Sequence, residues 1–214
     1  MESMELMPAR IRIASILKKA LFTGEYKSGD ELSLTDIAGQ LGVSRTPVRE
    51  AFQQLESEGL IELRMNKGAI VKPIDEKYIR DHYEMRILLE SEAARRAAIN
   101  GIPEVDTLLE RLNAIKEHMD RISTQEYESL NLDVHSAIWT AADNDRLSKF
   151  LSMLWNGPSI GLFNPKQDHY LKSTDEHIAI LTAIKEQDEK KAKEMMETHI
   201  KRSMNNILKN FNFQ

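Results

Sequence analysis

The feature that most constrains this chain is a pair of short helical segments separated by a glycine near the N-terminus. Residues 34–41 carry apolar side chains at helical spacing, and Gly42 follows directly. Ser44 is a typical residue to begin a second helix, and Pro47 falls in the first turn, where its missing N–H costs no hydrogen bond. The pattern therefore predicts two helices joined by a tight turn, the second spanning about residues 44–58.

Two short apolar runs follow, "LIELR" at residues 60–64 and "GAIVKPI" at residues 68–74. The linking "MNK" and the glycine after it indicate a β-hairpin, with Gly68 at a turn position. An additional helix is expected over about residues 9–23, and "KSGDELS" after it is typical of a turn. A winged helix-turn-helix domain is thus predicted for residues 1–75.

The remainder of the chain, residues 76–214, shows helical patterning and no strand signal. Glycine, proline and Asn-Asp pairs divide it into successive helices. The fold class predicted is mainly α, with the winged domain followed by an all-helical bundle. The expected helices span roughly residues 76–100, 104–121, 124–142, 146–163, 171–187 and 189–210.

Two arginines lie one turn apart at the start of the second short helix. In a helix-turn-helix this helix enters the DNA major groove with its N-terminus leading, so Arg45 and Arg49 would project side by side. Each guanidinium can donate two hydrogen bonds to a guanine. Because the formal net charge is −5, DNA contact must depend on where charges lie rather than on their number. The alternative is that both arginines are surface charges, with Arg49 paired to a glutamate.

Neighbouring residues suit the DNA backbone. Ser44 and Thr46 can bond phosphates at the helix N-terminus, where the helix dipole favours an anion. In the hairpin, Lys67 beside Gly68 could reach the adjacent minor groove or backbone. A single recognition helix reads few base pairs, so a two-fold dimer on a palindromic operator is expected.

The segment "LGVSRTPVREAFQQLESEGLI" closely resembles the DNA-binding signature of the GntR family of bacterial transcription regulators. The helical remainder looks like the effector domain of the FadR-type subfamily, called FCD. This resemblance implies a homodimeric regulator that binds double-stranded operator DNA and responds to a small carboxylate effector.

Three histidines, His135, His177 and His199, fall on different predicted helices. Asn131 lies four residues before His135 and shares its helix face, and an antiparallel pair of helices would bring His177 and His199 to a similar height. Three imidazoles and an oxygen donor suit a transition ion such as zinc. Taken singly, a histidine on a helix is more often an ordinary core or surface residue than a metal ligand.

The family resemblance implies a metal held by an acid, a histidine four residues later and two further histidines, which match Asn131, His135, His177 and His199. Asn131 departs from this pattern, because its amide oxygen is a neutral and poorer ligand. Asp133 should face elsewhere. The other histidines, His82, His118 and His169, are expected at the surface.

Arg86, in "YEMRILLESEAARRAA", resembles the motif arginine of the opening FCD helix, which implies a role in binding the effector carboxylate. The alternative is an ion pair with Glu90, one turn away.

Other function classes remain open at this stage. The histidine trio could activate water in a metal-dependent hydrolase, although the sequence offers no clear general base. A regulator could also lack the metal and bind an acyl chain or sugar acid. With no cysteine, no signal peptide and no apolar run near the roughly 20 residues of a membrane span, a cytoplasmic protein without membrane association is expected.

Overall fold

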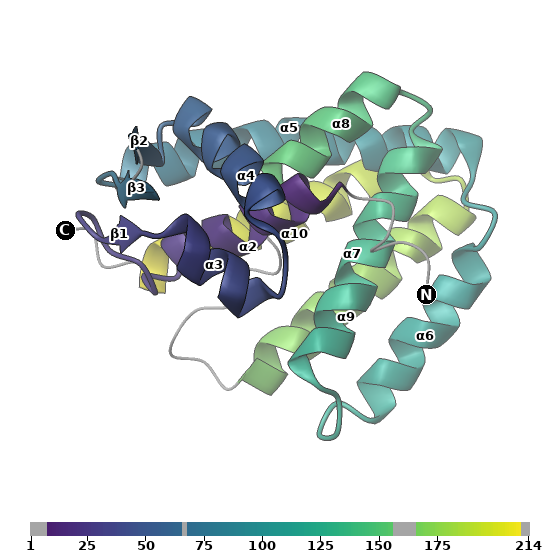
Figure 1. Cartoon of the computed structure of the whole chain (residues 1–214). Helices are drawn as coiled ribbons and strands as arrows, with labels where there is room; N and C mark the ends of the chain where they lie inside the picture. Colours follow the sequence, from purple (N-terminus) through teal and green to yellow (C-terminus); the bar gives the residue numbers. More distant parts are fainter. Residues whose placement is uncertain (1–7, 66–67, 156–165, 211–214) are drawn as a thin grey trace.

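The N-terminal part of the chain folds as predicted into short helices and a small sheet (Figure 1). The structure is a computed structural model, and it describes residues 8–65, 68–155 and 166–210. Lys67 therefore lies outside the described residues. The first elements are α2 (Ala9–Phe22), β1 (Glu31–Leu32), α3 (Leu34–Leu41), α4 (Arg45–Ser57), β2 (Ile61–Arg64) and β3 (Gly68–Val71).

Local chemistry sets the boundaries of α3 and α4. The side chain of Ser33 accepts a hydrogen bond from the Asp36 backbone N–H at 3.3 Å, which caps α3. Gly42 ends α3 in the left-handed conformation, with φ of 64°. Ser44 is the N-cap residue of α4, as predicted, yet its hydroxyl makes no capping bond and is exposed. The buried face of α4 consists of Val48, Ala51, Phe52 and Leu55.

The sheet contains one strand more than predicted. Within "KSGDELS", expected to be only a turn, residues Glu31 and Leu32 form β1 and pair antiparallel with β3, in the sheet order β1-β3-β2. A two-residue strand is too short to show alternation, and its partner is distant in sequence. Gly68 begins β3 at φ of 92°, and a Cβ there would lie 2.0 Å from the Leu32 carbonyl oxygen. A glycine is therefore required at position 68, because the backbone of β1 lies too close to leave room for a side chain.

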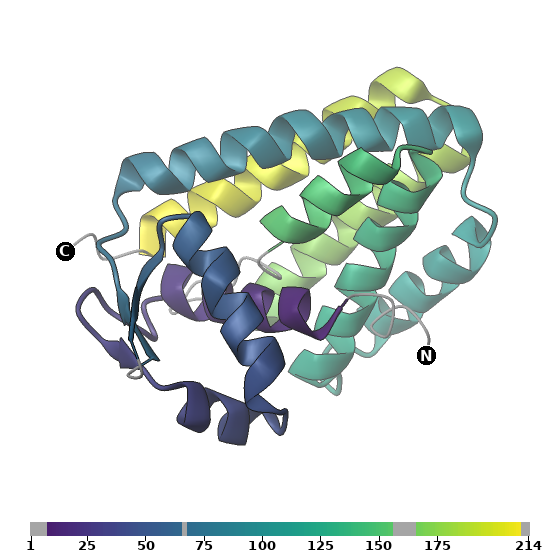
Figure 2. The same cartoon turned by 45° about the horizontal axis from the view of Figure 1, so that its top comes forward.

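The rest of the described chain is helical, so the predicted mainly α fold is confirmed. In Figure 2, α5 and α10 lie side by side along much of their length, and the shorter helices pack below them. Of the helix predicted over 146–163, the described part ends at Leu154, and Trp155 is extended (ψ 131°). Residues 156–163 lie outside the described residues. Conversely, α9 begins before its predicted start. The helices are α5 (Glu76–Asn100), α6 (Val105–Glu117), α7 (Thr124–Ala141), α8 (Asp145–Leu154), α9 (Lys166–Lys185) and α10 (Glu189–Asn210).

A buried lysine joins the two parts of the chain. Lys18 of α2 is completely buried, and its Nζ lies 2.7 Å from a carboxylate oxygen of Glu58, the residue that ends α4. The same ammonium group donates to the carbonyl oxygen of Met153 in α8. Through Lys18, the end of α4 is thus tied to the helical part.

No helix in the described ranges is long and apolar enough to span a membrane.

Candidate functional site

An open groove lies between the first turns of α4 and the β-hairpin. Arg45, Arg49 and Gln53 follow one another at intervals of four residues along α4 and line it from one side. Arg64 and Gly68 line it from the hairpin side. Arg45 and Arg49 are both exposed, and neither has an ion pair to a glutamate among the described contacts. Their predicted side-by-side arrangement is therefore present, with the positive charge facing solvent.

The structure adds residues to this groove that the sequence alone did not suggest. Gln53 could have been found from the spacing, because it continues the face of Arg45 and Arg49. Thr35 of α3 and Arg64 of β2 also line the groove, and no local pattern brings them together, since they come from different elements. The exposed hydroxyls of Ser44 and Thr46 lie at the N-terminal end of α4, which suits an anion.

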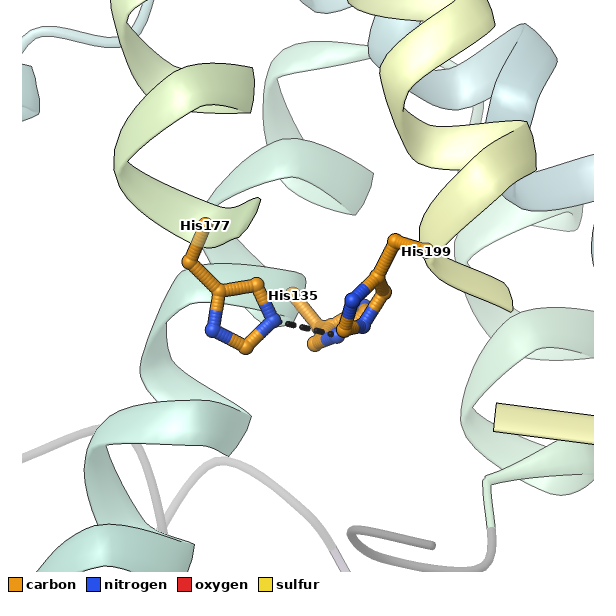
Figure 3. Close-up of side chains that lie close together, drawn as sticks. All are labelled: His135, His177 and His199. Carbon is orange, nitrogen blue, oxygen red and sulfur yellow. Dashed lines mark hydrogen bonds between the residues drawn. The ribbon is translucent and has the colours of Figure 1, made fainter. Parts of the chain in front are cut away.

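The three predicted histidines meet in the interior of the helical part. Figure 3 shows His135 from α7, His177 from α9 and His199 from α10 converging on one point. One ring nitrogen from each lies within 4.8 Å of the others, and the Nε2 atoms of His135 and His177 are 3.3 Å apart. All three side chains are buried. This cluster is called the histidine centre below.

Carboxylates orient two of the three rings from outside. The Nδ1 of His135 lies 2.6 Å from Glu90, and the Nδ1 of His199 lies 2.7 Å from Glu176. A carboxylate that accepts from one ring nitrogen fixes the ring and leaves the other nitrogen free as a ligand, which is usual around metal-binding histidines. The Nδ1 of His177 has no hydrogen-bond partner in the described part of the chain.

Each of these carboxylates is also paired with an arginine. Arg86 donates to Glu90 from Nε at 3.0 Å and from a terminal nitrogen at 2.6 Å, so the ion pair that was the alternative for Arg86 is formed. Arg202 contacts Glu176 in the same way, at 2.5 and 2.6 Å. Although burial alone would raise the pKa of Glu90, the nearby His135 and Arg86 outweigh it and hold that pKa well below the usual range.

Arg86 is enclosed on several sides. Its side chain is only 3% exposed, and its guanidinium lies 5.3 Å from the ring centres of both Tyr83 and Trp155. Trp155 in turn packs on His135, with ring centres 4.8 Å apart. Arg86 thus stands at the edge of the histidine centre and is joined to it through Glu90.

The remaining predicted side chains divide between the core and the surface. Asn131 is buried, and its Nδ2 has no partner among the described residues. Asp133 faces away from the histidine centre, as expected, and pairs with Arg111.

The three other histidines were predicted to lie at the surface. His118 is exposed, but the prediction was wrong for His82 and His169, which are 7% and 6% exposed. The ring of His82 packs on Phe22 of α2, and the Nδ1 of His169 lies 3.2 Å from the Nδ2 of Asn206 in α10. Sequence spacing does not reveal such contacts between elements.

The electrostatics of the centre favour metal ligation. Burial is the main cause that lowers the pKa of both His177 and His199, so these rings are neutral and their lone pairs are available to an ion. Three imidazoles with outer carboxylates form a donor set that fits a borderline ion such as zinc. The carboxylates that touch the histidines, Glu90 and Glu176, are both held by arginines, so neither is a free general base.

Comparison with family models gives two matches. Residues 10–71 match the model described as bacterial regulatory proteins, gntR family. Residues 81–202 match the FCD domain.

Curated relatives of similar length are transcription regulators. The chain is 30% identical over 190 residues to the gluconate operon transcriptional repressor of Bacillus subtilis, covering 83% of this chain and 76% of that protein. It is 30% identical over 209 residues to the Uxu operon regulator of Haemophilus influenzae, covering 88% and 78%. A match of 38% identity to a Mycobacterium tuberculosis HTH-type regulator, Rv0043c, spans less than half of either chain, 49% of this one and 44% of that one.

Solved structures share the fold. E. coli McbR/YncC aligns with a TM-score of 0.70 at 22% identity, over 97% of this chain and 100% of that one. The metal-free FCD domain of TM0439 aligns with a TM-score of 0.51 at 19% identity, over 64% of this chain and 96% of that one.

Proposed function

The chain belongs to the GntR family of bacterial regulatory proteins and carries an FCD domain, so it is a DNA-binding transcription regulator. We propose that it binds a palindromic operator as a homodimer. We further propose that it senses a small organic acid at a metal in the histidine centre. The observation that carries the sensing part is the meeting of three buried imidazoles from three helices.

The groove supports the assignment of the DNA-reading residues. Arg45, Arg49 and Gln53 present a continuous face on α4, and Arg and Gln are side chains that can each make two hydrogen bonds to a base edge. Ser44 and Thr46, which are exposed at the N-terminal end of α4, would bond phosphates, and Lys67 would reach the adjacent minor groove or backbone. The role of Gly68 is to let the hairpin pack against β1.

A metal would be held by His135, His177 and His199, with Asn131 as the oxygen donor one turn from His135. When bound, zinc would act as a Lewis acid with positions open to a carboxylate. The chain itself orients the rings through Glu90 and Glu176 and keeps the centre away from water.

An acid is the effector class that the local charges favour. Glu90 is balanced by Arg86 and Glu176 by Arg202, so a divalent ion adds positive charge that an anion would offset. The relative from Bacillus subtilis is named for the gluconate operon, and gluconate is a hydroxylated carboxylic acid. Arg86 is paired with Glu90, so its part in binding the acid would be indirect, by holding Glu90 against His135.

Direct contacts connect the histidine centre to α4. Trp155 packs on His135, and α8 ends immediately before it. In α8 the carbonyl of Met153 accepts from Lys18, which is paired with Glu58 at the end of α4. A ligand that favours one position of Trp155 and α8 would thereby change the placement of α4, provided that it binds the two arrangements with different affinity.

Selection from a random double-stranded DNA library tests the DNA-binding part. We expect a palindromic sequence to be recovered, and sedimentation should show two chains per site. Arg49→Ala should weaken binding to that sequence by about 1–3 kcal/mol, while Arg80→Ala, which removes an exposed charge from α5, should leave it unchanged. Equal affinity of Arg49→Ala and the unaltered chain would refute this placement of the recognition helix.

Metal analysis after dialysis against zinc tests the sensing part. One zinc per chain is expected, and His177→Ala should lose most of it while keeping operator binding in the absence of acid. His118→Ala is the matched control, because that imidazole is exposed and outside the centre. Unchanged zinc content and an unchanged response to gluconate in His177→Ala would leave only the DNA-binding function.

A further inference from the structure

The exposed side of α5 follows the spacing of a helix that packs along another helix. Residues that are exposed or half-buried recur there at intervals of four and three, and they are Asp81, Met85, Leu88, Glu92, Arg95 and Ile99. These intervals keep one stripe of a helix turned toward a partner helix over several turns. Within this stripe, Met85 is 49% exposed and Leu88 is 65% exposed. In the described part of the chain, its apolar centre is thus open to solvent.

Helix α8 lies beside α5 (Figure 2). Near the end of α5, the side chain of Asn100 donates to the carbonyl of Ala141 at 2.8 Å, a few residues before α8 begins. Nearer the start of α5, Arg86 lies 5.3 Å from the ring centre of Trp155, which directly follows α8. The two helices therefore run antiparallel. Because each helix rises about 1.5 Å per residue, positions on α8 can be placed by their height along α5.

Two exposed apolar side chains of α8 extend this stripe sideways. Met153 is 40% exposed and lies two residues before Trp155, which places it about level with Leu88. Phe150 is 57% exposed and lies about one turn further toward the end of α5. Met85, Leu88, Phe150 and Met153 are called the α5–α8 surface below. Large apolar side chains gathered on neighbouring helices mark a protein–protein contact, whereas those scattered singly do not.

Unpaired charges of opposite sign border the two ends of the α5–α8 surface. Glu84 lies one turn before Leu88, and Lys149 lies one turn before Met153, with Arg146 beyond it. All three charged side chains are exposed, and none forms an ion pair with another described residue. By its height, Lys149 lies about as far beyond Leu88 as Glu84 lies before it. Within one chain Glu84 and Lys149 are therefore about two turns apart, which is too far for them to pair.

We propose that the α5–α8 surface is where two copies of this chain meet in the homodimer. When the two-fold axis passes across the helices at Leu88, each α5 runs antiparallel to α5 of the other copy, and the two apolar centres cover each other. The same rotation brings Glu84 of each copy to the height of Lys149 in the other, so both unpaired charges gain a partner. This inference rests on the proposed function, which requires a homodimer, and it assigns the surface.

A second copy fits this surface because the surface complements itself. A two-fold contact requires a patch to match its own rotated image, and here the negative end comes to lie opposite the positive end. Two ends of the same sign would repel in such a contact. The surface also adjoins the link to the DNA-binding part, since the carbonyl of Met153 accepts from the buried Lys18. A dimer formed here would hold both α4 helices through that link.

Sedimentation equilibrium of the full chain measures the dissociation constant of the dimer. Leu88→Glu should raise this constant at least about hundredfold, because the two-fold axis brings the new carboxylates of both copies together. Since Leu88 is exposed in a single chain, the variant should keep the helical circular dichroism of the unaltered protein. Ile16→Glu is the matched control, because it places the same charge at an exposed apolar position of α2, and it should leave the constant unchanged.

An exchange of charges tests the surface without removing its apolar contacts. Glu84→Lys and Lys149→Glu should each raise the dissociation constant of their own homodimer about tenfold, since like charges then face each other. An equimolar mixture of the two variants should form heterodimers about as tightly as the unaltered chain dimerises, because opposite charges again meet at both ends. Glu117→Lys reverses an exposed acid of α6 and should change the dissociation constant of neither kind of dimer.

The outcomes separate the surface from the proposed function. If the unaltered chain is monomeric both alone and on a selected operator, the proposed homodimer itself fails. A homodimer that Leu88→Glu leaves intact overturns the α5–α8 surface alone. The same holds if the two charge variants bind each other no more tightly than each binds itself. Should Leu88→Glu fail to fold, the charge exchange decides.

Discussion

Replacing Glu58 should destabilise the protein more than replacing the lysine that it pairs with. Lys18 is 0% exposed and Glu58 is 20% exposed, so the two ends of this ion pair have unequal access to water. In Glu58→Gln the buried ammonium keeps its bond to the Met153 carbonyl but loses its counter-charge. In Lys18→Met the carboxylate can turn toward solvent, and a similar apolar volume fills the interior.

The expected magnitudes follow from this asymmetry. Removing one partner of a buried pair costs about 3–5 kcal/mol, and the partial exposure of Glu58 places Glu58→Gln near the lower end, about 3 kcal/mol. Lys18→Met leaves one carbonyl without a donor, which costs about 1 kcal/mol. The double variant should be more stable than Glu58→Gln alone, because the unpaired charge is gone.

Urea unfolding followed by circular dichroism and by the fluorescence of Trp139 and Trp155 measures these free energies of unfolding. Glu50→Gln is the matched control, since it removes an exposed carboxylate from the same helix and should change stability by at most about 0.5 kcal/mol. A cost for Glu58→Gln no larger than that for Lys18→Met would refute the reasoning.

The deficit of Glu58→Gln should also depend on pH with a definite sign. Burial lowers the pKa of Lys18, and Glu58 partly opposes that effect, so loss of Glu58 lowers the folded-state pKa further. The unfolded chain then binds more protons than the folded one, and stability rises with pH. The deficit relative to the unaltered chain should therefore shrink as pH rises from the variant's folded pKa to the folded pKa that Lys18 has in the unaltered chain, and it should stay constant above that pH.

Further expectations concern the hairpin and the metal. Lys67→Ala should weaken binding to all DNA sequences evenly and reduce the slope of log affinity against log salt by about 1, as measured by titration at several salt concentrations. Gly68→Ala should destabilise the hairpin by at least about 1 kcal/mol, because its Cβ would lie 2.0 Å from the Leu32 carbonyl oxygen; an unchanged melting temperature would contradict this. Asn131→Asp should raise zinc affinity in a competition assay with a chelator, since a carboxylate is a stronger ligand than an amide.

The helix boundaries that depend on local chemistry could be predicted from the sequence. Gly42 and Ser44 act on the backbone within a turn of themselves, and the structure places the α3–α4 turn at these residues. By contrast, β1 exists only through its pairing with β3, and α8 ends at an extended Trp155 that packs among side chains from other helices. Such contacts between distant segments leave no periodic signal.

The histidine centre was predictable in its members but not in its surroundings. His135, His177 and His199 could be selected because the family resemblance singled them out, and helical spacing was compatible with their meeting. Glu176 and Arg202 were not foreseen, because a charged residue on a helix is ordinarily assigned to the surface. Both are drawn inward by pairing with each other and with His199.

The pairing of charges around the centre explains why Asn131 is a consequential residue. Arg86 offsets Glu90 and Arg202 offsets Glu176, so these four side chains contribute no net charge. With three neutral imidazoles and a neutral amide, a divalent ion would retain both positive charges in a buried site. A carboxylate at position 131 would neutralise one of them from within the chain. Asn131 instead leaves that charge to be offset by the ligand, so the same substitution that strengthens zinc binding should weaken the binding of an acid.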